Sequence, residues 1–332
     1  MLRDLLRLRS RPIATRKDWA AKRAQIRDAV YSIIGKPPLR KPPLSPEIVS
    51  EENLDGYLRR KVSYQVERDE RVSAYLLIPH RLRRPAPAVL CLHETRNEGK
   101  DILMEIPGLD RRECHDYAID LVKRGYVTLS PDHLCAGERV PRGFIPYDTR
   151  PFYDRHPGWS AVGKALWDNR RALDYLETLN MIDPGRLGAI GHSLGAHSAI
   201  FLAAFDQRVK TTMASCGLTT FEEDEKRLEW ARDHWYIYMP KLRPLFLAGK
   251  KAPFDFHELV SLIAPRAFLN STALNDQCFA STDAVSELAV KVNKVYRLLD
   301  AEDKFACYLH GQRHSFTREV KSLAYTWFDL WL

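Results

Sequence analysis

The feature that most constrains this chain is a serine between two glycines, at the junction of a predicted strand and a predicted helix. Residues 186–195 read Arg-Leu-Gly-Ala-Ile-Gly-His-Ser-Leu-Gly. Gly191 and Gly195 allow a sharp, strained turn in which larger side chains would clash. Such a turn exposes the hydroxyl of Ser193 and points backbone N–H groups at developing negative charge. The motif alone is common, and a structural serine in a Gly-rich turn is the alternative.

Strand and helix signals alternate along most of the chain. Segments 59–66 and 71–79 alternate like two antiparallel strands, and the apolar run 86–92 is typical of a buried strand. Further strands are predicted at 126–130, 186–190, 209–214, 267–271 and 306–309, and helices at 16–34, 112–124, 160–179, 193–205, 284–299 and 317–330. This order predicts an α/β fold, with a mostly parallel central sheet and helices on both faces.

Two segments stand outside this alternation. Residues 1–57 are predicted to be an N-terminal helical extension that ends in a Pro-rich connector at 36–56, which leaves 58–332 as the catalytic domain. Residues 217–265 are too long for a simple connection and are rich in aromatic residues. We therefore expect them to be an insertion near Ser193. It precedes the predicted strand at 267–271, which leads to the candidate acidic residue described below.

Charge and cysteine patterns narrow the classes of partner. Residues 1–43 carry 12 Lys and Arg against 3 Asp and Glu, so the rest of the chain is close to neutral. No basic stripe surrounds Ser193, so nucleic acid is not an expected partner. Residues 1–12 could contact an anionic membrane surface, and a short surface helix is the alternative.

The sequence lacks patterns that are typical of a membrane span, of paired cysteines or of a metal site. No apolar run reaches the ~18 residues of a membrane span. Six scattered cysteines without CxxC spacing, and no secretory signal, predict reduced thiols in the cytoplasm. No metal-ligand motif such as HExxH occurs, so neither a metal nor another cofactor is expected.

A serine nucleophile needs a base and an acid, which in this arrangement follow the serine in the order acid, then histidine. Asp276 falls in the loop after the strand at 267–271, and His314 falls in the loop after the last strand. His314 could take the proton of Ser193 while Asp276 fixes its tautomer. The alternatives are Asp283 and the acidic run Glu222–Glu225 for the acid, and His310 for the histidine.

When a serine attacks an acyl group, the carbonyl oxygen of that group becomes a negatively charged oxyanion. Two backbone N–H groups are needed to bind it. One comes from the residue after the nucleophile and one from the loop after the strand at 86–92, which reads His93-Glu94-Thr95-Arg96. We therefore assign the backbone N–H of Leu194, with that of Glu94 or Thr95.

These residues resemble a known family. The segments Val89-Leu-Cys-Leu-His-Glu, Pro131-Asp-His, Trp159-Ser-Ala-Val-Gly, Trp167-Asp-Asn-Arg-Arg-Ala-Leu-Asp-Tyr-Leu and Gly191-His-Ser-Leu-Gly, with Asp276 and His314, resemble the dienelactone hydrolase and acetyl xylan esterase-like branch of the α/β-hydrolases over residues 58–332. The resemblance implies the α/β-hydrolase fold and a glutamate, Glu94, close to the nucleophile. Dienelactone hydrolases carry cysteine where Ser193 stands and are shorter, which argues against dienelactone as the substrate.

Substrate contacts are predicted for one carboxylate, one arginine and three aromatic residues: Glu94, Arg139, Trp159, Trp235 and Tyr236. Ligand pockets are mostly apolar and aromatic, and Arg139 could meet a substrate carboxylate. The alternatives are loop packing for the aromatic residues and a solvated or salt-bridged side chain for Arg139. Glu94 could instead be a loop carboxylate paired with Arg96 or Lys100.

Together these residues predict a serine carboxylic ester hydrolase that acts on a small-molecule ester through an acyl-enzyme. A lactone hydrolase of the dienelactone type, a peptidase or an acyltransferase could use the same triad. A non-enzymatic binding protein that kept the fold is the alternative from another class.

Overall fold

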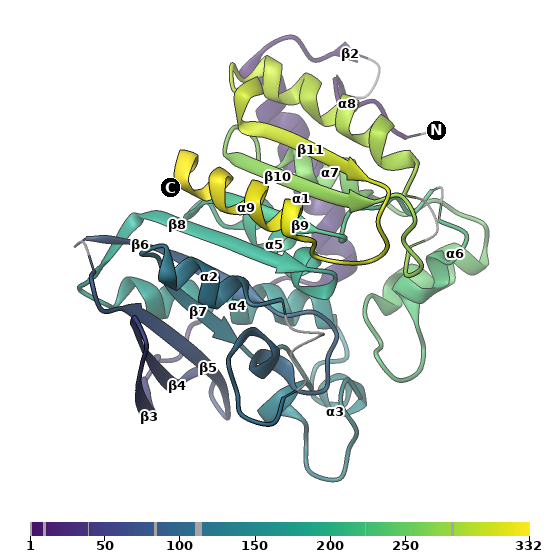
Figure 1. Cartoon of the computed structure of the whole chain (residues 1–332). Helices are drawn as coiled ribbons and strands as arrows, with labels where there is room; N and C mark the ends of the chain where they lie inside the picture. The colour runs from purple at the N-terminus through teal and green to yellow at the C-terminus, as the bar shows by residue number, and fades with distance from the viewer. Residues whose placement is uncertain are drawn as a thin grey trace.

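A nine-stranded sheet forms the centre of the molecule (Figure 1). The computed structural model describes residues 2–8, 11–38, 40–82, 85–109, 115–222, 224–279 and 282–332. The sheet consists of β3 (Glu47–Leu54), β4 (Tyr57–Glu67), β5 (Glu70–Pro79), β6 (Ala86–Leu92), β7 (Val127–Pro131), β8 (Ile182–His192), β9 (Val209–Ser215), β10 (Ala267–Ala273) and β11 (Phe305–His310). Its order is β11-β10-β9-β8-β6-β7-β5-β4-β3, antiparallel from β3 to the β5–β7 pair and parallel from β7 to β11.

Helices cover both faces of the sheet. They are α1 (Arg16–Ile34), α2 (Tyr117–Lys123), α3 (Arg150–Arg155), α4 (Ala161–Glu177), α5 (Leu194–Phe205), α6 (Arg243–Leu247), α7 (Phe256–Ser261), α8 (Ala284–Leu298) and α9 (Arg318–Trp331). In Figure 1, α2 and α9 lie on the face toward the viewer, and α1 and α5 lie behind the sheet. The predicted fold class, a mostly parallel sheet with helices on both faces, is confirmed.

The alternating side chains of β6 show how the sheet joins two hydrophobic cores. Ala88 and Leu90 belong to the core that also contains buried residues of α1, α4, α5 and α8. Val89 and Cys91 point the other way, into the core beneath α2 and α9. Successive side chains of a strand face opposite sides, so a strand between two helical layers is apolar throughout.

The order of the strands creates a crevice at their carboxyl ends. After β6 the chain continues to α2 on one face, and after the neighbouring β8 it continues to α5 on the other face. Loops that leave adjacent parallel strands in opposite directions open a space between them, and ligands of open α/β sheets bind there. The loop after β6 and the Ser193 turn both border this space.

One strand of the central sheet was not predicted. The expected Pro-rich connector at 36–56 contains β3, which pairs with β4 as the edge of the sheet. Its side chains are exposed almost throughout, so it lacks the alternation of apolar and polar residues that reveals a half-buried strand. The other predicted strands and helices are present, with shifts of a few residues at their ends; residues 112–114 of the helix predicted at 112–124 lie outside the described residues.

The N-terminal segment differs from the short surface helix that the sequence offered as an alternative. The described residues before α1 form a short β1–β2 hairpin (Arg7–Leu8 and Arg11–Pro12) and no helix. Leu2 and Leu5 are only 3% and 2% exposed and belong to the main core. Arg3 pairs with Glu258 at 2.8 Å. Leu2 and Leu5 are therefore not free to enter a membrane, and a contact of the basic residues 1–12 with an anionic surface stays a prediction.

No helix in the described part of the chain is both long and apolar enough to cross a membrane.

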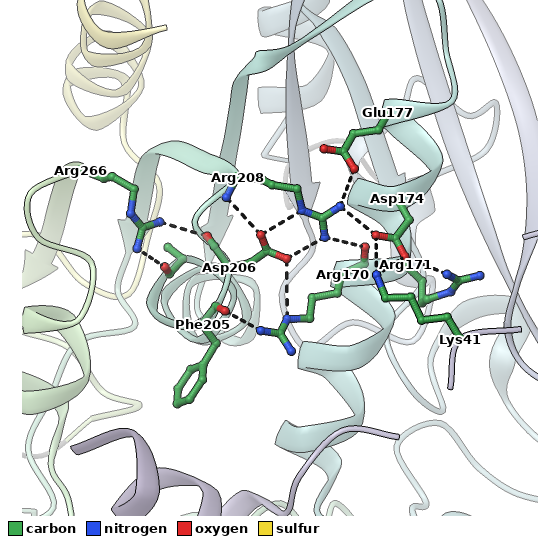
Figure 2. A network of polar contacts seen from close by, with 10 residues as sticks. Lys41, Arg170, Arg171, Asp174, Glu177, Phe205, Asp206, Arg208 and Arg266 are labelled. Atoms are coloured by element: carbon green, nitrogen blue, oxygen red, sulfur yellow. Dashed lines mark hydrogen bonds and ion pairs between the residues drawn. The ribbon is translucent and has the colours of Figure 1, made fainter. Parts of the chain in front are cut away.

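A polar network joins the segments that precede β8 and β9, at the end of these strands away from the crevice (Figure 2). The guanidinium of Arg208 lies 2.7 Å from Asp206, 2.8 Å from Asp174 and 2.7 Å from Glu177, and thereby joins the end of α4 to the turn before β9. Lys41 reaches the same Asp174 at 2.9 Å. Burial opposes the charge of Asp206, but hydrogen bonds from Arg208 hold its pKa below the usual range.

The buried leucines of the N-terminal segment predict a stability effect. Leu5→Ala should lower the free energy of unfolding by about 2–5 kcal/mol, because it removes buried methyl groups and leaves a cavity. Urea unfolding followed by circular dichroism measures this change. Arg11→Ala, at an exposed position of the same hairpin, should stay within about 0.5 kcal/mol of the parent. Equal stability of the two variants would contradict the described packing.

Candidate active site

Ser193 occupies a strained turn between β8 and α5. Its backbone has φ 53° and ψ −118°, a left-handed conformation that residues other than glycine rarely adopt. Its N–H donates to the carbonyl oxygen of Ser215 at 2.8 Å, which anchors the turn to the end of β9. Strain of this kind persists only where surrounding structure holds it, and it is common at functional sites.

The two glycines of the motif are required by close backbone approach. A Cβ on Gly195 would lie 1.9 Å from the carbonyl oxygen of Leu92, the last residue of β6. A Cβ on Gly191 would lie 2.2 Å from the carbonyl carbon of Gly195. A side chain at Gly195 would push the turn away from β6, and one at Gly191 would push the start of α5 away from β8. The glycines therefore keep Ser193 beside the loop that follows β6.

Asp276 and His314 meet at the ends of two neighbouring strands. Asp276 follows β10 and His314 follows β11, and Oδ2 of Asp276 lies 2.7 Å from Nδ1 of His314. The other oxygen, Oδ1, accepts hydrogen bonds from the N–H groups of Cys278 at 2.7 Å and Phe279 at 3.2 Å. The carboxylate is therefore fixed on both oxygens, and it orients the imidazole.

The environment of His314 favours its charged form. Burial opposes a positive charge on the ring, but hydrogen bonds to Asp276 and Cys278 and the electrostatic attraction of both outweigh it and raise the pKa of His314 to about 9. The Asp276 side chain is buried and His314 is only slightly exposed, so water screens this attraction weakly.

A cysteine lies beside this pair. Cys216, Asp276 and His314 each place a potential ligand atom within 4.8 Å of the others. Ligands of a tetrahedral zinc ion stand about 3.3 Å or more apart, whereas the oxygen and nitrogen of the Asp276–His314 pair are 2.7 Å apart. These atoms are therefore arranged for a hydrogen bond rather than for a metal. Burial raises the pKa of Cys216 to about 11, which disfavours a nucleophilic thiolate.

A cavity of about 760 Å³ opens at the crevice, and Ser193, Leu194 and His314 line it. Glu94 and Thr95, from the loop after β6, form another part of its wall. The residues predicted for the nucleophile, the base and the oxyanion donors thus share one cavity. Asp276 lies directly behind His314.

Part of the segment 217–265, from Asp224 to Tyr238, contributes residues to the wall of the cavity. Trp235 and Tyr236, two of the predicted substrate contacts, line the cavity, and Trp235 is 39% exposed. Other lining residues of this segment were not predicted as contacts: Asp224, Lys226, Glu229, Trp230, Arg232 and Tyr238. The wall combines aromatic rings with charged groups of both signs.

The structure does not support a substrate contact for Arg139. Its guanidinium is buried, 2.6 Å from Glu70 and 2.7 Å from Asp168, and it does not line the cavity. Arg139 is therefore the salt-bridged side chain of the alternative interpretation.

Trp159 is also placed elsewhere than predicted. It is buried, and a Cβ added to Gly163 at the start of α4 would lie 2.3 Å from its indole nitrogen. Trp159 does not line the cavity. It therefore packs α4 and its neighbouring loops, and the prediction of a substrate contact is wrong.

Of the rival candidates for the acid and the histidine, Asp283, Glu222, Glu225 and His310 do not line the cavity. Asp283 immediately precedes α8, and Glu222 pairs with Lys251; residue 223 of the acidic run lies outside the described residues. His310 is the last residue of β11. Asp224 lines the cavity, but its carboxylate accepts hydrogen bonds from Trp230 and Lys226 rather than from a histidine.

Glu94 has a partner that sequence reasoning missed. Its Oε1 lies 2.8 Å from Nδ1 of His115, and both residues line the cavity. The alternative partner Lys100 instead contacts Asp132 at 2.7 Å and Glu138 at 2.9 Å. No motif marks His115 in the sequence, since it is far from Glu94 along the chain and only folding brings the two together.

A family model described as the abhydrolase family matches residues 1–315 of this chain. The chain belongs to the abhydrolase family. A protein of Bacillus subtilis (strain 168), named Putative hydrolase YtaP, is 26% identical over 313 residues, which cover 93% of this chain and 100% of that protein.

Solved structures share the fold of this abhydrolase. A glucuronoyl esterase from Solibacter usitatus aligns with a TM-score of 0.81 at 21% identity and covers 99% of this chain and 97% of that one. A putative acetyl xylan esterase from Bacteroides fragilis NCTC 9343 aligns with a TM-score of 0.68 at 21% identity and covers 89% and 76%. The fold is that of the α/β-hydrolases.

The contact of Gly195 with Leu92 predicts a large effect of one methyl group. Gly195→Ala should lower the free energy of unfolding by about 3 kcal/mol or more, because backbone atoms stand where the Cβ would be. Gly158→Ala adds the same methyl group where no atom lies within 4 Å, so it should change stability by less than about 0.5 kcal/mol. Thermal and urea unfolding of both variants test this difference; a Gly195→Ala protein as stable as the control would contradict the described turn.

Proposed function

We propose that this abhydrolase hydrolyses carboxylic esters with Ser193 as nucleophile, His314 as general base and Asp276 as the acid that orients it. The observation that carries the proposal is the Asp276–His314 hydrogen bond behind a cavity that contains Ser193 on a strained turn. A nucleophile, a base and an orienting carboxylate are the three roles that acyl transfer through serine requires.

The reaction then proceeds in two stages. His314 accepts the proton of Ser193 as its oxygen bonds to the ester carbon, and it returns this proton to the departing alcohol when the C–O bond breaks. Water next attacks the acyl-enzyme, His314 takes a proton from that water, and Ser193 regains its proton as the acid leaves. The N–H of Leu194, with that of Glu94 or Thr95, is proposed to bind the oxyanion in both stages.

The wall of the cavity supports a carbohydrate ester as the substrate class. Trp235 and Tyr236 present aromatic rings, which pack well against the C–H faces of sugar rings, while the charged groups beside them can bind hydroxyl groups. Two proteins of the same fold are named as glucuronoyl and acetyl xylan esterases. A panel of sugar acetates, uronate methyl esters, simple acyl esters, lactones and peptides tests the class, and hydrolysis of peptides alone would overturn it.

The proposed roles predict a severe effect of two substitutions. Ser193→Ala and His314→Ala should each lower kcat on p-nitrophenyl acetate by about 10⁴-fold or more, since the three residues act as a unit. His310→Gln, at the end of β11, should change kcat less than about threefold. Steady-state kinetics on folded variants measure these effects, and a Ser193→Ala enzyme with a tenth of the parent activity would show that another residue is the nucleophile.

The raised pKa of His314 predicts the pH dependence of the reaction. The base must be neutral to accept a proton, so kcat/KM of the parent should rise with pH and level off above about 9. Asp276→Asn removes the negative charge that raises this pKa. The variant should be slower by about 10⁴-fold, and its profile should level off at a lower pH. An unshifted profile would mean that Asp276 does not interact with the base.

A further inference from the structure

The imidazole of His197 lines the cavity without a hydrogen-bond partner in the described part of the chain. His197 lies in the first turn of α5, where its backbone N–H donates to the carbonyl oxygen of Ser193 at 3.1 Å. Residues four apart share one face of a helix, so the ring lies on the side of α5 that carries Ser193. The residue is only 5% exposed. The roles proposed above leave this side chain unused.

The packing of the ring distinguishes its two nitrogens. Nε2 is enclosed and has no hydrogen-bond partner. The neighbouring Cδ2 faces the backbone that follows β9, since a Cβ on Gly217 would lie 3.3 Å from it. Nδ1 lies on the opposite edge of the imidazole, and the described residues offer it no partner either. Nδ1 of His197 is therefore the ring nitrogen that a molecule in the cavity can reach.

The ring of His197 is neutral. Burial, helped by the nearby charge of His314, lowers the pKa of His197 to about 3. A neutral imidazole has one N–H that donates and one bare nitrogen that accepts. A hydroxyl group can do both, so it can bond to Nδ1 in either tautomer of the ring. A charged group, in contrast, would find no opposite charge on His197.

Aromatic side chains hold the imidazole in place. The centroid of the His197 ring lies 4.7 Å from that of Trp230 and 5.6 Å from that of Phe279, and both of these residues also line the cavity. In such apolar surroundings a hydrogen bond is strengthened, and a polar group without a partner is costly. The bond that the protein does not supply to Nδ1 is therefore left to a molecule in the cavity.

A carboxylate lies beside the same aromatic rings. Asp224 is buried and lines the cavity, and it accepts hydrogen bonds from Nε1 of Trp230 at 3.0 Å and from the backbone N–H of Lys226 at 2.8 Å. Each carboxylate oxygen has a further lone pair for another donor. His197 and Asp224 both contact Trp230, so this part of the cavity suits a group with more than one hydroxyl, such as a sugar ring.

We propose that His197 is a specificity-determining residue, whose Nδ1 forms a hydrogen bond with a ring hydroxyl of the ester substrate. The inference rests on the proposed ester hydrolysis and specifies where the hydroxyl groups bind. The hydroxyl can belong to the acid part or to the alcohol part of the ester, and the assays distinguish the two. His197 takes no part in making or breaking bonds, so esters without ring hydroxyls should not depend on it.

Two pairs of esters separate hydroxyl binding from a structural role. Methyl glucuronate is compared with methyl cyclohexanecarboxylate, and a monoacetylated methyl xyloside with cyclohexyl acetate; in each pair only one ring carries hydroxyls. His197→Leu should lower kcat/KM about tenfold or more on the hydroxylated member of one pair, because the hydroxyl loses its partner. It should change kcat/KM less than about threefold on both other rings and on p-nitrophenyl acetate. The pair that responds shows which part of the ester His197 binds.

Two further substitutions distinguish the nitrogens of His197. The amide of His197→Asn takes the place of Nδ1, whereas that of His197→Gln reaches the place of Nε2. The asparagine variant should retain at least about fivefold more activity than the leucine variant on the hydroxylated ester, and the glutamine variant should not. Recovery by glutamine alone would overturn the role of Nδ1. The asparagine variant also decides the matter if the leucine variant does not fold.

The neutral ring predicts a second signature. Since the pKa of His197 is about 3, the preference of the parent for the hydroxylated member of the responding pair should stay constant between about pH 5 and pH 9. A preference that changes within this range would overturn the proposal, because a titrating group would then bind the hydroxyl. His80→Leu, at an exposed position, is the matched control and should leave the preference and kcat unchanged.

The outcome is separable from that of the proposed function. Ser193→Ala is assayed beside these variants, and circular dichroism and thermal unfolding confirm the fold of each. If Ser193→Ala is inactive while His197→Leu loses activity equally on both members of each pair, or on neither, the inference fails and the serine mechanism stands. If Ser193→Ala stays active on p-nitrophenyl acetate, the serine mechanism fails, whereas a lost preference in His197→Leu still demonstrates hydroxyl binding.

Discussion

The site depends on the contact between the backbone of Gly195 and the carbonyl of Leu92. This contact joins the start of α5, which follows β8, to the end of the neighbouring strand β6. The chain leaves β8 and β6 toward opposite faces of the sheet. It holds Ser193 beside the loop that carries Glu94 and Thr95. The proposed nucleophile and the proposed oxyanion donors are therefore positioned by one backbone approach, for which a glycine is required.

Buried charged side chains are paired with partners both at the candidate site and in other parts of the fold. Arg139 neutralises Glu70 and Asp168 outside the cavity lining, and Arg208 does the same for Asp174 and Asp206 in the turn before β9. Such groups fix neighbouring elements in position. Asp276 and Glu94 follow the same rule, but each is paired with a histidine that lines the cavity. An imidazole can exchange or share a proton, so these two pairs can take part in chemistry while the arginine pairs cannot.

The two segments that interrupt the alternating pattern contact each other. Arg3 of the N-terminal segment and Lys22 of α1 both lie near Glu258 of α7, which belongs to the stretch between β9 and β10. Asp255, at the start of α7, accepts the N–H of Phe221 within that stretch. The N-terminal segment is therefore fastened to α7, within the stretch between β9 and β10.

The sequence by itself determined the elements, the turn that carries Ser193, and the chain order that singles out Asp276 and His314. These follow from local rules: apolar periodicity, the steric demand of a tight turn, and the position of loops after strands. Only the tertiary structure decided that β3 joins the sheet, that Arg139 and Trp159 lie outside the cavity, and that Glu94 pairs with His115. Each of these depends on burial or on residues distant along the chain, and no local pattern encodes which distant side chains will meet.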